Sequence, residues 1–227
     1  HQAGMGWMNS HPHKEVGYKA ELNHNCVTIA EVLKQAGYAT YMTGKWHLAL
    51  KPDAQTPHLP EDKKYDWPLQ RGFDKFYGII FGAANYYDPG ALCRGNQLIS
   101  PYTDKEYHPQ QYYFTNAISD NSVKFIKERD KKKPFFMYVA YTTAHWPMQA
   151  PENEILKYKG KYNKGYEAVR KARFERMKKL GVIDSNMQLS PPDSEAITPS
   201  WADEKYKPAM ERRMETAAIH RRIADHQ

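Results

Sequence analysis

Two stretches of the chain share one order of hydrophobic and polar positions, a helical period followed by a strand. In the first stretch, apolar residues recur with helical spacing over residues 29–33. Thr28 and Glu31 form a capping box at the start of this helix, and Gly37 supplies a stop. Residues 38–43 are rich in Tyr and Thr, which is typical of a strand. This part of the chain therefore predicts a helix that leads directly into a strand.

The second stretch repeats this order about ninety residues later. A helix is predicted to begin at Thr115 or Asn116, with an approximate apolar stripe behind it. Cations over residues 127–133 suit the negative end of the helix dipole, and Pro134 ends the helix. Residues 135–141 form a continuous apolar run. Such a run predicts a strand that is covered on both faces.

Helix-to-strand units in series predict an α/β fold, with a mostly parallel sheet and helices on both faces. Ligands of such sheets bind beyond the carboxyl ends of the strands. Lys45 and His47 follow the first predicted strand, and His145 follows the second. We therefore expect these three side chains to lie at the same edge of the sheet.

The rest of the chain has weaker patterns. Residues 51–110 read as mostly irregular, with aromatic residues among Gly, Pro and Asp. A loop region of this length is either functional or contains short elements that the pattern does not reveal. Residues 152–180 predict helical pieces broken near two glycines, residues 184–200 a linker, and residues 204–224 a further helix.

A lysine with two histidines suits an anionic group that is rich in oxygen. Lys45 supplies a point charge, while His47 and His145 can donate, accept or transfer a proton near neutral pH. The simpler interpretation is that each histidine only bonds backbone groups at a strand end. The paired placement of the histidines behind two strands favours the chemical interpretation.

Charge and composition narrow the possible partners. The chain has 227 residues, a net charge of +7 and a hydrophobic content of 41%, which argues against disorder. The charge fits a nucleic acid, an acidic glycan, a sulfated or phosphorylated small molecule, or simply a solvated basic face. Glu167 and Glu175 interrupt the basic stretch 157–179, so we expect no nucleic acid. The apolar run 135–141 is too short for a membrane span.

Few residues suggest a metal or a nucleophile. His11, His13 and His24 are close in sequence, but no carboxylate cluster accompanies them, and we predict no metal ligands on this chain. Cys26 and Cys93 are too few for a disulfide scaffold. Neither cysteine lies at a helix start beside a cation, so we expect both to be unreactive.

Residues 37–47 read G-Y-A-T-Y-M-T-G-K-W-H. This run resembles the second signature of the type I sulfatases, G-Y-x-T-x-x-x-G-K-W-H. Residues 26–33 resemble the helix that precedes that signature, and residues 134–147 resemble the later strand that ends in a catalytic His before Pro. Parts of residues 158–173 resemble the arylsulfatase branch. The resemblance extends from residue 1 to about residue 218.

The resemblance implies an alkaline-phosphatase-like α/β fold and hydrolysis of a sulfate ester to an alcohol and sulfate. It implies a formylglycine nucleophile, a calcium ion and an exported protein. Lys45 would neutralise sulfate oxygens, His47 would contact the formylglycine hydroxyls, and His145 would protonate the leaving alcohol. Apart from the resemblance, we expect the aromatic loop around Asn85, Tyr86 and Tyr87 to face the alcohol part of the substrate, a small-molecule or glycan sulfate ester, with Asn85 as a substrate-binding residue.

The sequence also departs from the family pattern. Neither Cys26 nor Cys93 stands in the nucleophile motif C/S-x-P/A-x-R, and the family's metal ligands would lie before His1 and after Gln227. We therefore expect residues 1–227 to be a partial sulfatase catalytic domain that lacks the nucleophile and metal segment and the C-terminal part. By itself it would be inactive. The alternatives are a phosphatase or phosphodiesterase of the same superfamily, or a non-catalytic binder of sulfated glycans.

Overall fold

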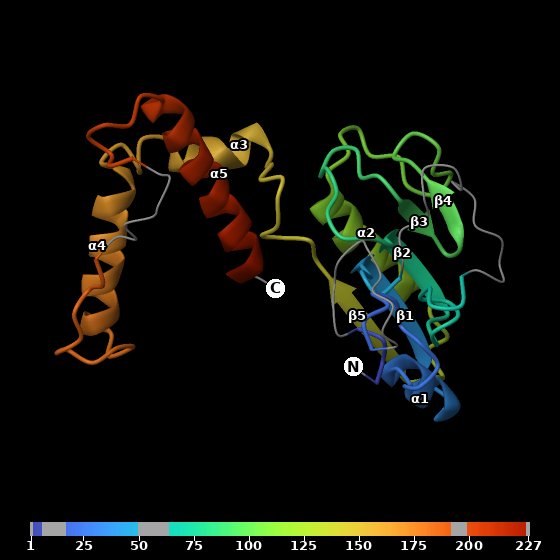
Figure 1. The fold of residues 1–227 in the computed structure, drawn as a ribbon. Coiled ribbons are helices and arrows are strands. Elements are labelled where there is room, and N and C mark those ends of the chain that lie inside the picture. The colour runs from blue at the N-terminus through green and yellow to red at the C-terminus, as the bar shows by residue number, and fades with distance from the viewer. Residues whose placement is uncertain (1, 6–16, 50–63, 192–198, 226–227) are drawn as a thin grey trace. The chain divides into compact units, whose positions relative to one another are not determined.

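A computed structural model describes residues 2–5, 17–49, 64–191 and 199–225 of the protein. Their contacts form two compact units, residues 1–147 and residues 148–227. Figure 1 shows that the first unit contains the sheet and that the second is helical.

The first unit is built on one sheet of five strands in the order β4-β3-β2-β1-β5. The strands are β1 (Ala39–Lys45), β2 (Lys75–Ile79), β3 (Leu92–Arg94), β4 (Gln97–Ile99) and β5 (Phe135–Ala140). Strands β5, β1 and β2 run parallel, and β3 and β4 add an antiparallel hairpin at the far side. The predicted parallel part is therefore present, and it forms the β2-β1-β5 end of a mixed sheet.

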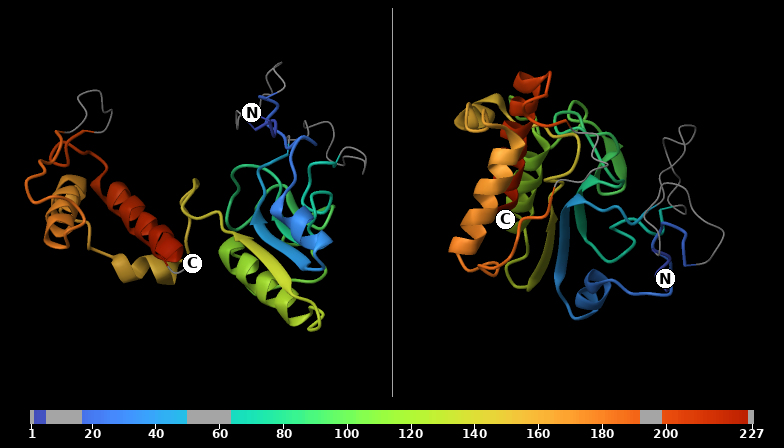
Figure 2. Two further views of the ribbon diagram at one scale, coloured as in Figure 1. Left: turned by 90° about the horizontal axis from the view of Figure 1, so that it is seen from below. Right: turned by 60° about the vertical axis from the view of Figure 1, so that its left-hand side comes forward.

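Helices cover both faces of this sheet, as predicted. Helix α1 (Ile29–Gln35) lies against one face and α2 (Phe114–Lys127) against the other (Figure 2). Successive strand residues point to opposite faces, so the neighbours Phe76 and Tyr77 of β2 belong to different cores. Phe76 packs on the α1 side and Tyr77 on the α2 side, and both are fully buried.

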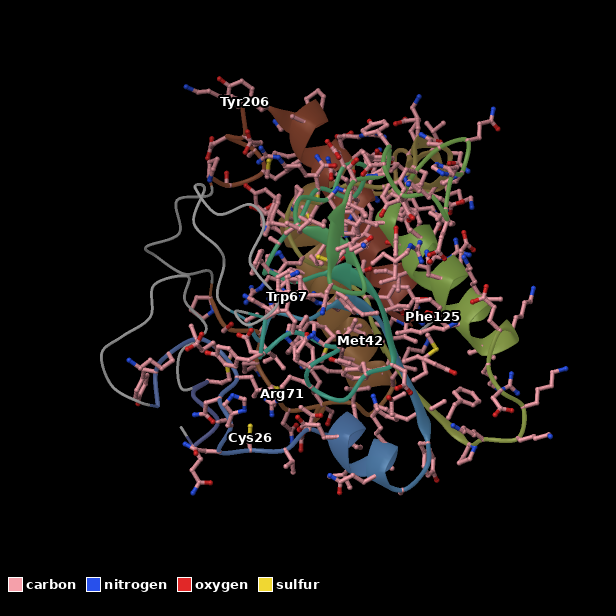
Figure 3. All side chains as sticks on the ribbon, turned by 90° about the vertical axis from the view of Figure 1, so that its right-hand side faces the viewer. Cys26, Met42, Trp67, Arg71, Phe125 and Tyr206 are labelled. Atoms are coloured by element: carbon pink, nitrogen blue, oxygen red, sulfur yellow. The ribbon has the colours of Figure 1, made fainter. Side chains whose placement is uncertain are left out.

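The start of α1 confirms the predicted capping box. The backbone N–H of Glu31 donates to Thr28 Oγ1 at 3.1 Å, and the N–H of Thr28 donates to Glu31 Oε2 at 2.6 Å. The guanidinium of Arg71 donates to Glu31 Oε1 at 2.9 Å and to the carbonyl oxygen of Cys26 at 2.8 Å. Figure 3 shows Arg71 and Cys26 side by side. A side chain forty residues away therefore supports the cap.

Two predicted faces are not buried in this structure. Ile29 and Val32 belong to the apolar stripe of α1, but they are 61% and 52% exposed, because α1 turns Ala30 towards the sheet instead. The expectation that β5 is covered on both faces is wrong here. Tyr138 and Val139 are exposed. The reason is position, because β5 lies at the end of the strand order and β1 is its single neighbour among the described strands.

The region predicted as mostly irregular contains three strands. Strands β2, β3 and β4 all lie between residues 75 and 99. They have only three to five residues each, β2 contains Gly78, and Gly95 follows β3. This outcome confirms the second of the two possibilities for the long loop region, namely short elements without a visible period. Residues 51–63 of that region lie outside the described residues.

The second unit is made of helices. It contains α3 (Glu152–Ile155), a 3₁₀ turn (Leu156–Tyr158), α4 (Gly165–Lys179) and α5 (Lys207–Asp225). The breaks near Gly160 and Gly165 and the last helix are therefore confirmed, although α5 begins three residues later than expected. Its small core joins Ala150 and Ile155 to Ile219 of α5. Among the described residues, no helix has both the length and the apolar character that a membrane crossing requires.

Candidate functional site

Lys45 and His47 stand at the carboxyl end of β1, where the sheet ladder continues past the strand. The N–H of Trp46 donates to the carbonyl of Ile79, and that of His47 to the carbonyl of Ile80, both at 2.9 Å. His145 follows β5 by five residues. Since β1 and β5 are parallel neighbours, residues beyond their carboxyl ends share one edge of the sheet. The expected juxtaposition of the three residues therefore follows from the strand order.

Electrostatics also connects the three side chains. The pKa of His47 is lowered first by burial and then by the positive charges of Lys45 and His145. Burial also lowers the pKa of Lys45. Among the described residues no carboxylate pairs with Lys45. This edge of the sheet is thus a concentration of positive charge that lacks a counterion from the described chain.

The imidazole of His145 is oriented by the backbone next to it. Its Nδ1 lies 2.7 Å from the carbonyl oxygen of Trp146. A carbonyl can only accept, so Nδ1 bears the proton and Nε2 is the nitrogen that remains for other chemistry. The N–H of His145 donates to the carbonyl of Thr142 at 3.1 Å, which closes a tight turn. The side chain of His145 itself is exposed.

The side-chain oxygen of Asn85 stabilises the loop that contains it. Its Oδ1 accepts from the backbone N–H of Tyr87 at 2.8 Å and from that of Asp88 at 3.1 Å. The residue is exposed, so its amide NH₂ is the group that a substrate would meet. Tyr86 does not face a substrate, contrary to expectation, because the side chain is only 1% exposed and packs in the core. Substrate binding by Asn85 stays a prediction.

The described residues do not fit a calcium site. No group of three or more His, Cys, Asp or Glu side chains gathers among them, whereas calcium takes six to eight oxygen ligands. His24 packs against the ring of Tyr65, with 5.3 Å between the ring centroids. His11 and His13 lie outside the described residues.

The two cysteines are free thiols, and neither is placed as a nucleophile. Cys93 is fully buried in β3, and burial raises the pKa of its thiol to about 12. The thiolate is the reactive form of cysteine, so Cys93 is unreactive near neutral pH. Cys26 is half-buried and its Sγ lies 3.6 Å from the carbonyl oxygen of Asn23. The prediction that Cys93 is inert is thereby supported.

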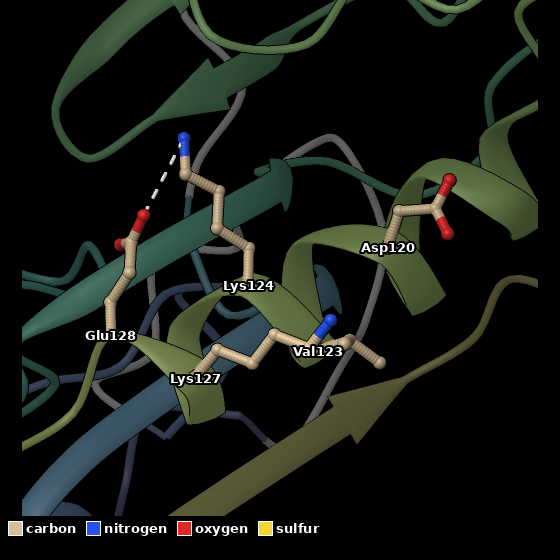
Figure 4. Close-up of a pocket in the computed structure, with 5 residues that line it drawn as sticks. All are labelled: Asp120, Val123, Lys124, Lys127 and Glu128. Carbon is tan, nitrogen blue, oxygen red and sulfur yellow. Dashed lines mark ion pairs between the residues drawn. The ribbon is translucent and has the colours of Figure 1, made fainter.

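A shallow hollow of about 390 Å³ lies elsewhere, on the outer side of α2 (Figure 4). Its lining residues all come from this helix and the residue after it: Asp120, Val123, Lys124, Lys127 and Glu128. The ammonium group of Lys124 forms an ion pair with Glu106 at 2.6 Å and a longer one with Glu128 at 4.0 Å. None of Lys45, His47 or His145 contributes to this hollow, so it is not the site described above.

Sequence reasoning missed two residues that shape this edge. Gly82 lies directly against the ring of His47, and the buried hydroxyl of Tyr86 donates to the carbonyl of Thr142 at 3.0 Å. The sequence singles out the aromatic loop that contains Tyr86, but only as a surface for the substrate. Nothing in a linear pattern indicates that a residue at position 86 touches the turn at positions 142–145.

Comparison with known proteins gives the family. The sequence profile of the family Sulfatase matches residues 3–216. An arylsulfatase of Klebsiella aerogenes is 32% identical over 209 residues, which cover 87% of this chain and 42% of that protein. An uncharacterised sulfatase of Schizosaccharomyces pombe is 32% identical over 219 residues, with 88% of this chain and 37% of that protein covered. The chain thus spans about two fifths of the length of these relatives.

Solved structures support the fold. Ps i-CgsB, crystallised with a neocarrahexaose, is similar with a TM-score of 0.51 at 22% identity, over 69% of this chain and 35% of that one. A Bacteroides thetaiotaomicron protein from the metabolism of multiple glycosaminoglycans gives a TM-score of 0.51 at 16% identity, over 91% and 38%. At these identities the likeness concerns the fold, and it agrees with the predicted alkaline-phosphatase-like α/β class. With its G-K-W-H run at the end of β1, this chain belongs to the sulfatase family.

Proposed function

We propose that Lys45, His47 and His145 form part of the sulfate-binding and proton-transfer site of a sulfuric ester hydrolase of the arylsulfatase type. The observation that supports this most is the gathering of three basic side chains at the ends of two adjacent parallel strands. Within the described chain this positive charge has no counterion at Lys45. A sulfate group would supply one.

Each residue has a role that follows from its position. Lys45 is half-buried, so its ammonium group interacts strongly with an anion that enters the site. His47 lies beside it with a lowered pKa and is neutral over more of the pH range than an ordinary histidine. A neutral imidazole can accept a proton from a hydroxyl group at this edge.

His145 is proposed as the acid for the leaving group. Its Nδ1 is engaged by the carbonyl of Trp146, which leaves Nε2 to carry the transferable proton when the imidazole is charged. When the bond between sulfur and the alcohol oxygen breaks, that oxygen takes up the proton from Nε2. The contribution of such an acid is greatest for alcohols that are poor leaving groups.

The family profile extends over both compact units, so we propose that residues 1–227 belong to one sulfatase catalytic domain. We propose also that the protein is exported and acts on a small-molecule or glycan sulfate ester. Neither Cys26 nor Cys93 lies in the family's nucleophile motif. The 227-residue chain by itself should therefore not hydrolyse sulfate esters.

The first experiment measures sulfate binding by the chain itself. NMR signals of His47 and His145 are followed while sodium sulfate is added at constant ionic strength. We expect saturable shifts that are lost in Lys45→Met and kept in Lys34→Met. Lys34→Met is the control because Lys34 is an exposed lysine of α1, where it forms an ion pair with Asp74 at 2.8 Å. Equal responses of the two variants would contradict the assignment of Lys45.

The second experiment compares an aryl sulfate with the aryl phosphate of the same alcohol, using the protein in its full natural length. Faster hydrolysis of the sulfate supports the proposal, and faster hydrolysis of the phosphate supports a phosphatase. If the protein hydrolyses neither ester but binds a sulfated glycan in a salt-sensitive way, it is a non-catalytic binder. His145→Ala should lower the rate mainly for poor leaving groups, and an equal loss on all substrates contradicts the acid role.

A further inference from the structure

A buried tyrosine supports the turn from which His145 projects. Tyr86 is 1% exposed, and its hydroxyl donates to the carbonyl oxygen of Thr142 at 3.0 Å. The carbonyl oxygen of His145 lies 3.4 Å from the same hydroxyl. Both ends of the turn over residues 142–145 are therefore within reach of one phenol group.

The turn needs this support because little else orients His145. Its N–H bonds back to the carbonyl of Thr142, so that carbonyl accepts from both His145 and Tyr86. The imidazole is exposed, and its one hydrogen bond among the described residues goes to the backbone of Trp146. The direction of Nε2 thus depends on how well the backbone of residues 142–146 is fixed.

Tyr86 is itself firmly placed. Its carbonyl accepts from the N–H of Phe114, the first residue of α2, at 2.7 Å. Its ring stacks on that of Tyr113, with 5.7 Å between the centroids. Burial raises the pKa of the hydroxyl above its ordinary value, so it keeps its proton near neutral pH and can donate. The support therefore comes from the core of the first unit.

We propose that Tyr86 is a positioning residue for His145. Its hydroxyl fixes the turn so that Nδ1 stays on the Trp146 carbonyl and Nε2 faces the edge that holds Lys45 and His47. The proposal rests on the function proposed above in assigning a purpose to Nε2. The structural part of the proposal can be tested separately. It states that the hydroxyl of Tyr86 sets the tautomer and the ring orientation of His145.

The test is Tyr86→Phe in the 227-residue chain, which removes the hydroxyl and keeps the ring. Long-range nitrogen–proton NMR spectra report which nitrogen of neutral His145 carries the proton. We expect the Nδ1-protonated form to dominate in the unchanged chain. Its ratio to the Nε2-protonated form should fall about fivefold in the variant, the effect of one ordinary hydrogen bond.

Tyr41→Phe is the matched control. Tyr41 is also buried, in the same core, and its hydroxyl has no hydrogen bond among the described residues. This variant should leave the His145 tautomer unchanged. An unchanged tautomer in a folded Tyr86→Phe chain would overturn the proposal, and so would equal changes in the two variants.

A further measurement separates this proposal from the proposed function. If sulfate shifts the signals of His47 in Tyr86→Phe as it does in the unchanged chain while the His145 tautomer changes, both proposals hold. If sulfate shifts neither chain but the tautomer still depends on Tyr86, the positioning role stands and the sulfate site fails. In the full-length protein, Tyr86→Phe should lower kcat for poor leaving groups and leave KM unchanged.

Discussion

Gly82 lies against the imidazole of His47 so closely that a methyl group on its α-carbon would stand 3.0 Å from Nε2 and 3.2 Å from Cε1. Ordinary contacts between such atoms are about 3.5–4.0 Å. The ring would have to move away from any side chain at this position. The half-buried state of His47, which lowers its pKa, therefore depends on a glycine at position 82.

The first prediction concerns this contact. Gly82→Ala should push the ring of His47 towards solvent, and its pKa should rise towards the ordinary value because less of its surface is desolvated. NMR titration of the Cε1 proton measures this pKa. Ala83→Ser changes the exposed neighbouring residue and should have no effect. An unchanged His47 pKa in Gly82→Ala would contradict the prediction.

The second prediction concerns the contact between β1 and β2. Gly44 and Gly78 are register partners, and a Cβ on Gly78 would lie 1.7 Å from the carbonyl oxygen of Gly44. Gly78→Ala must separate the two strands, so we expect the free energy of unfolding to fall by about 3 kcal/mol. Urea denaturation followed by tryptophan fluorescence measures it, since Trp46 and Trp67 are buried nearby.

Gly90→Ala serves as the control for that substitution. Nothing lies within 4 Å of a Cβ at position 90, and its φ is not in the left-handed region. The variant should unfold within about 0.5 kcal/mol of the unchanged chain. Equal stability of the two alanine variants would show that β1 and β2 do not approach each other as the structure describes.

The third prediction concerns the buried guanidinium of Arg71, whose side chain is 2% exposed. Arg71→Met leaves Glu31 without its ion-pair partner and removes the guanidinium donor from the loop carbonyls of Asn23 and Cys26. Removal of one member of a largely buried ion pair costs about 3 kcal/mol of stability. Denaturation midpoints check this loss.

Lys34→Met is the comparison for Arg71→Met. It breaks an ion pair with Asp74 at 2.8 Å whose side chains are 49% and 36% exposed. Exposed pairs contribute less than about 1 kcal/mol, so this variant should be almost as stable as the unchanged chain. A larger loss for Lys34→Met than for Arg71→Met would be the contrary result.

The fourth prediction concerns the pH dependence of the second unit. His220 of α5 is fully buried, and its Nε2 accepts from the backbone N–H of Gln149 at 2.9 Å. Burial lowers the pKa of the imidazole below the ordinary 6.5. As the pH falls below 6.5, the unfolded state binds a proton that the folded state does not. The free energy of unfolding should therefore decrease as the pH is lowered from about 7 towards the depressed folded-state pKa.

Thermal unfolding followed by circular dichroism of the helices checks the behaviour of His220. His220→Gln cannot take up that proton, so its melting temperature should depend less on pH over the same range. The comparison stays above about pH 5 because carboxylates titrate below it. Parallel pH profiles of the two proteins would rule out His220 as the group responsible.

The sequence alone determined the local helices and strands with a visible pattern, and it placed the candidate site residues directly after two of the strands. The capping box at Thr28 and Glu31 places the start of α1, because both partners lie within one turn and their bond needs no tertiary contact. Lys45, His47 and His145 follow two strands whose pattern is visible in the sequence. Parallel strands share their carboxyl edge, so the meeting of the three residues could be expected in advance.

Only the tertiary structure decided which surfaces are buried and what supports the site. The helical period of α1 is the same whichever side faces the sheet, and packing turned Ala30 inwards and left Ile29 and Val32 exposed. Strands β2 to β4 are too short to show a period, and their pairing partners stabilise them. The contacts of Gly82 with His47 and of Tyr86 with Thr142 join residues up to 56 positions apart. Such contacts exist only once the chain has folded, because no local rule relates residues so far apart in sequence.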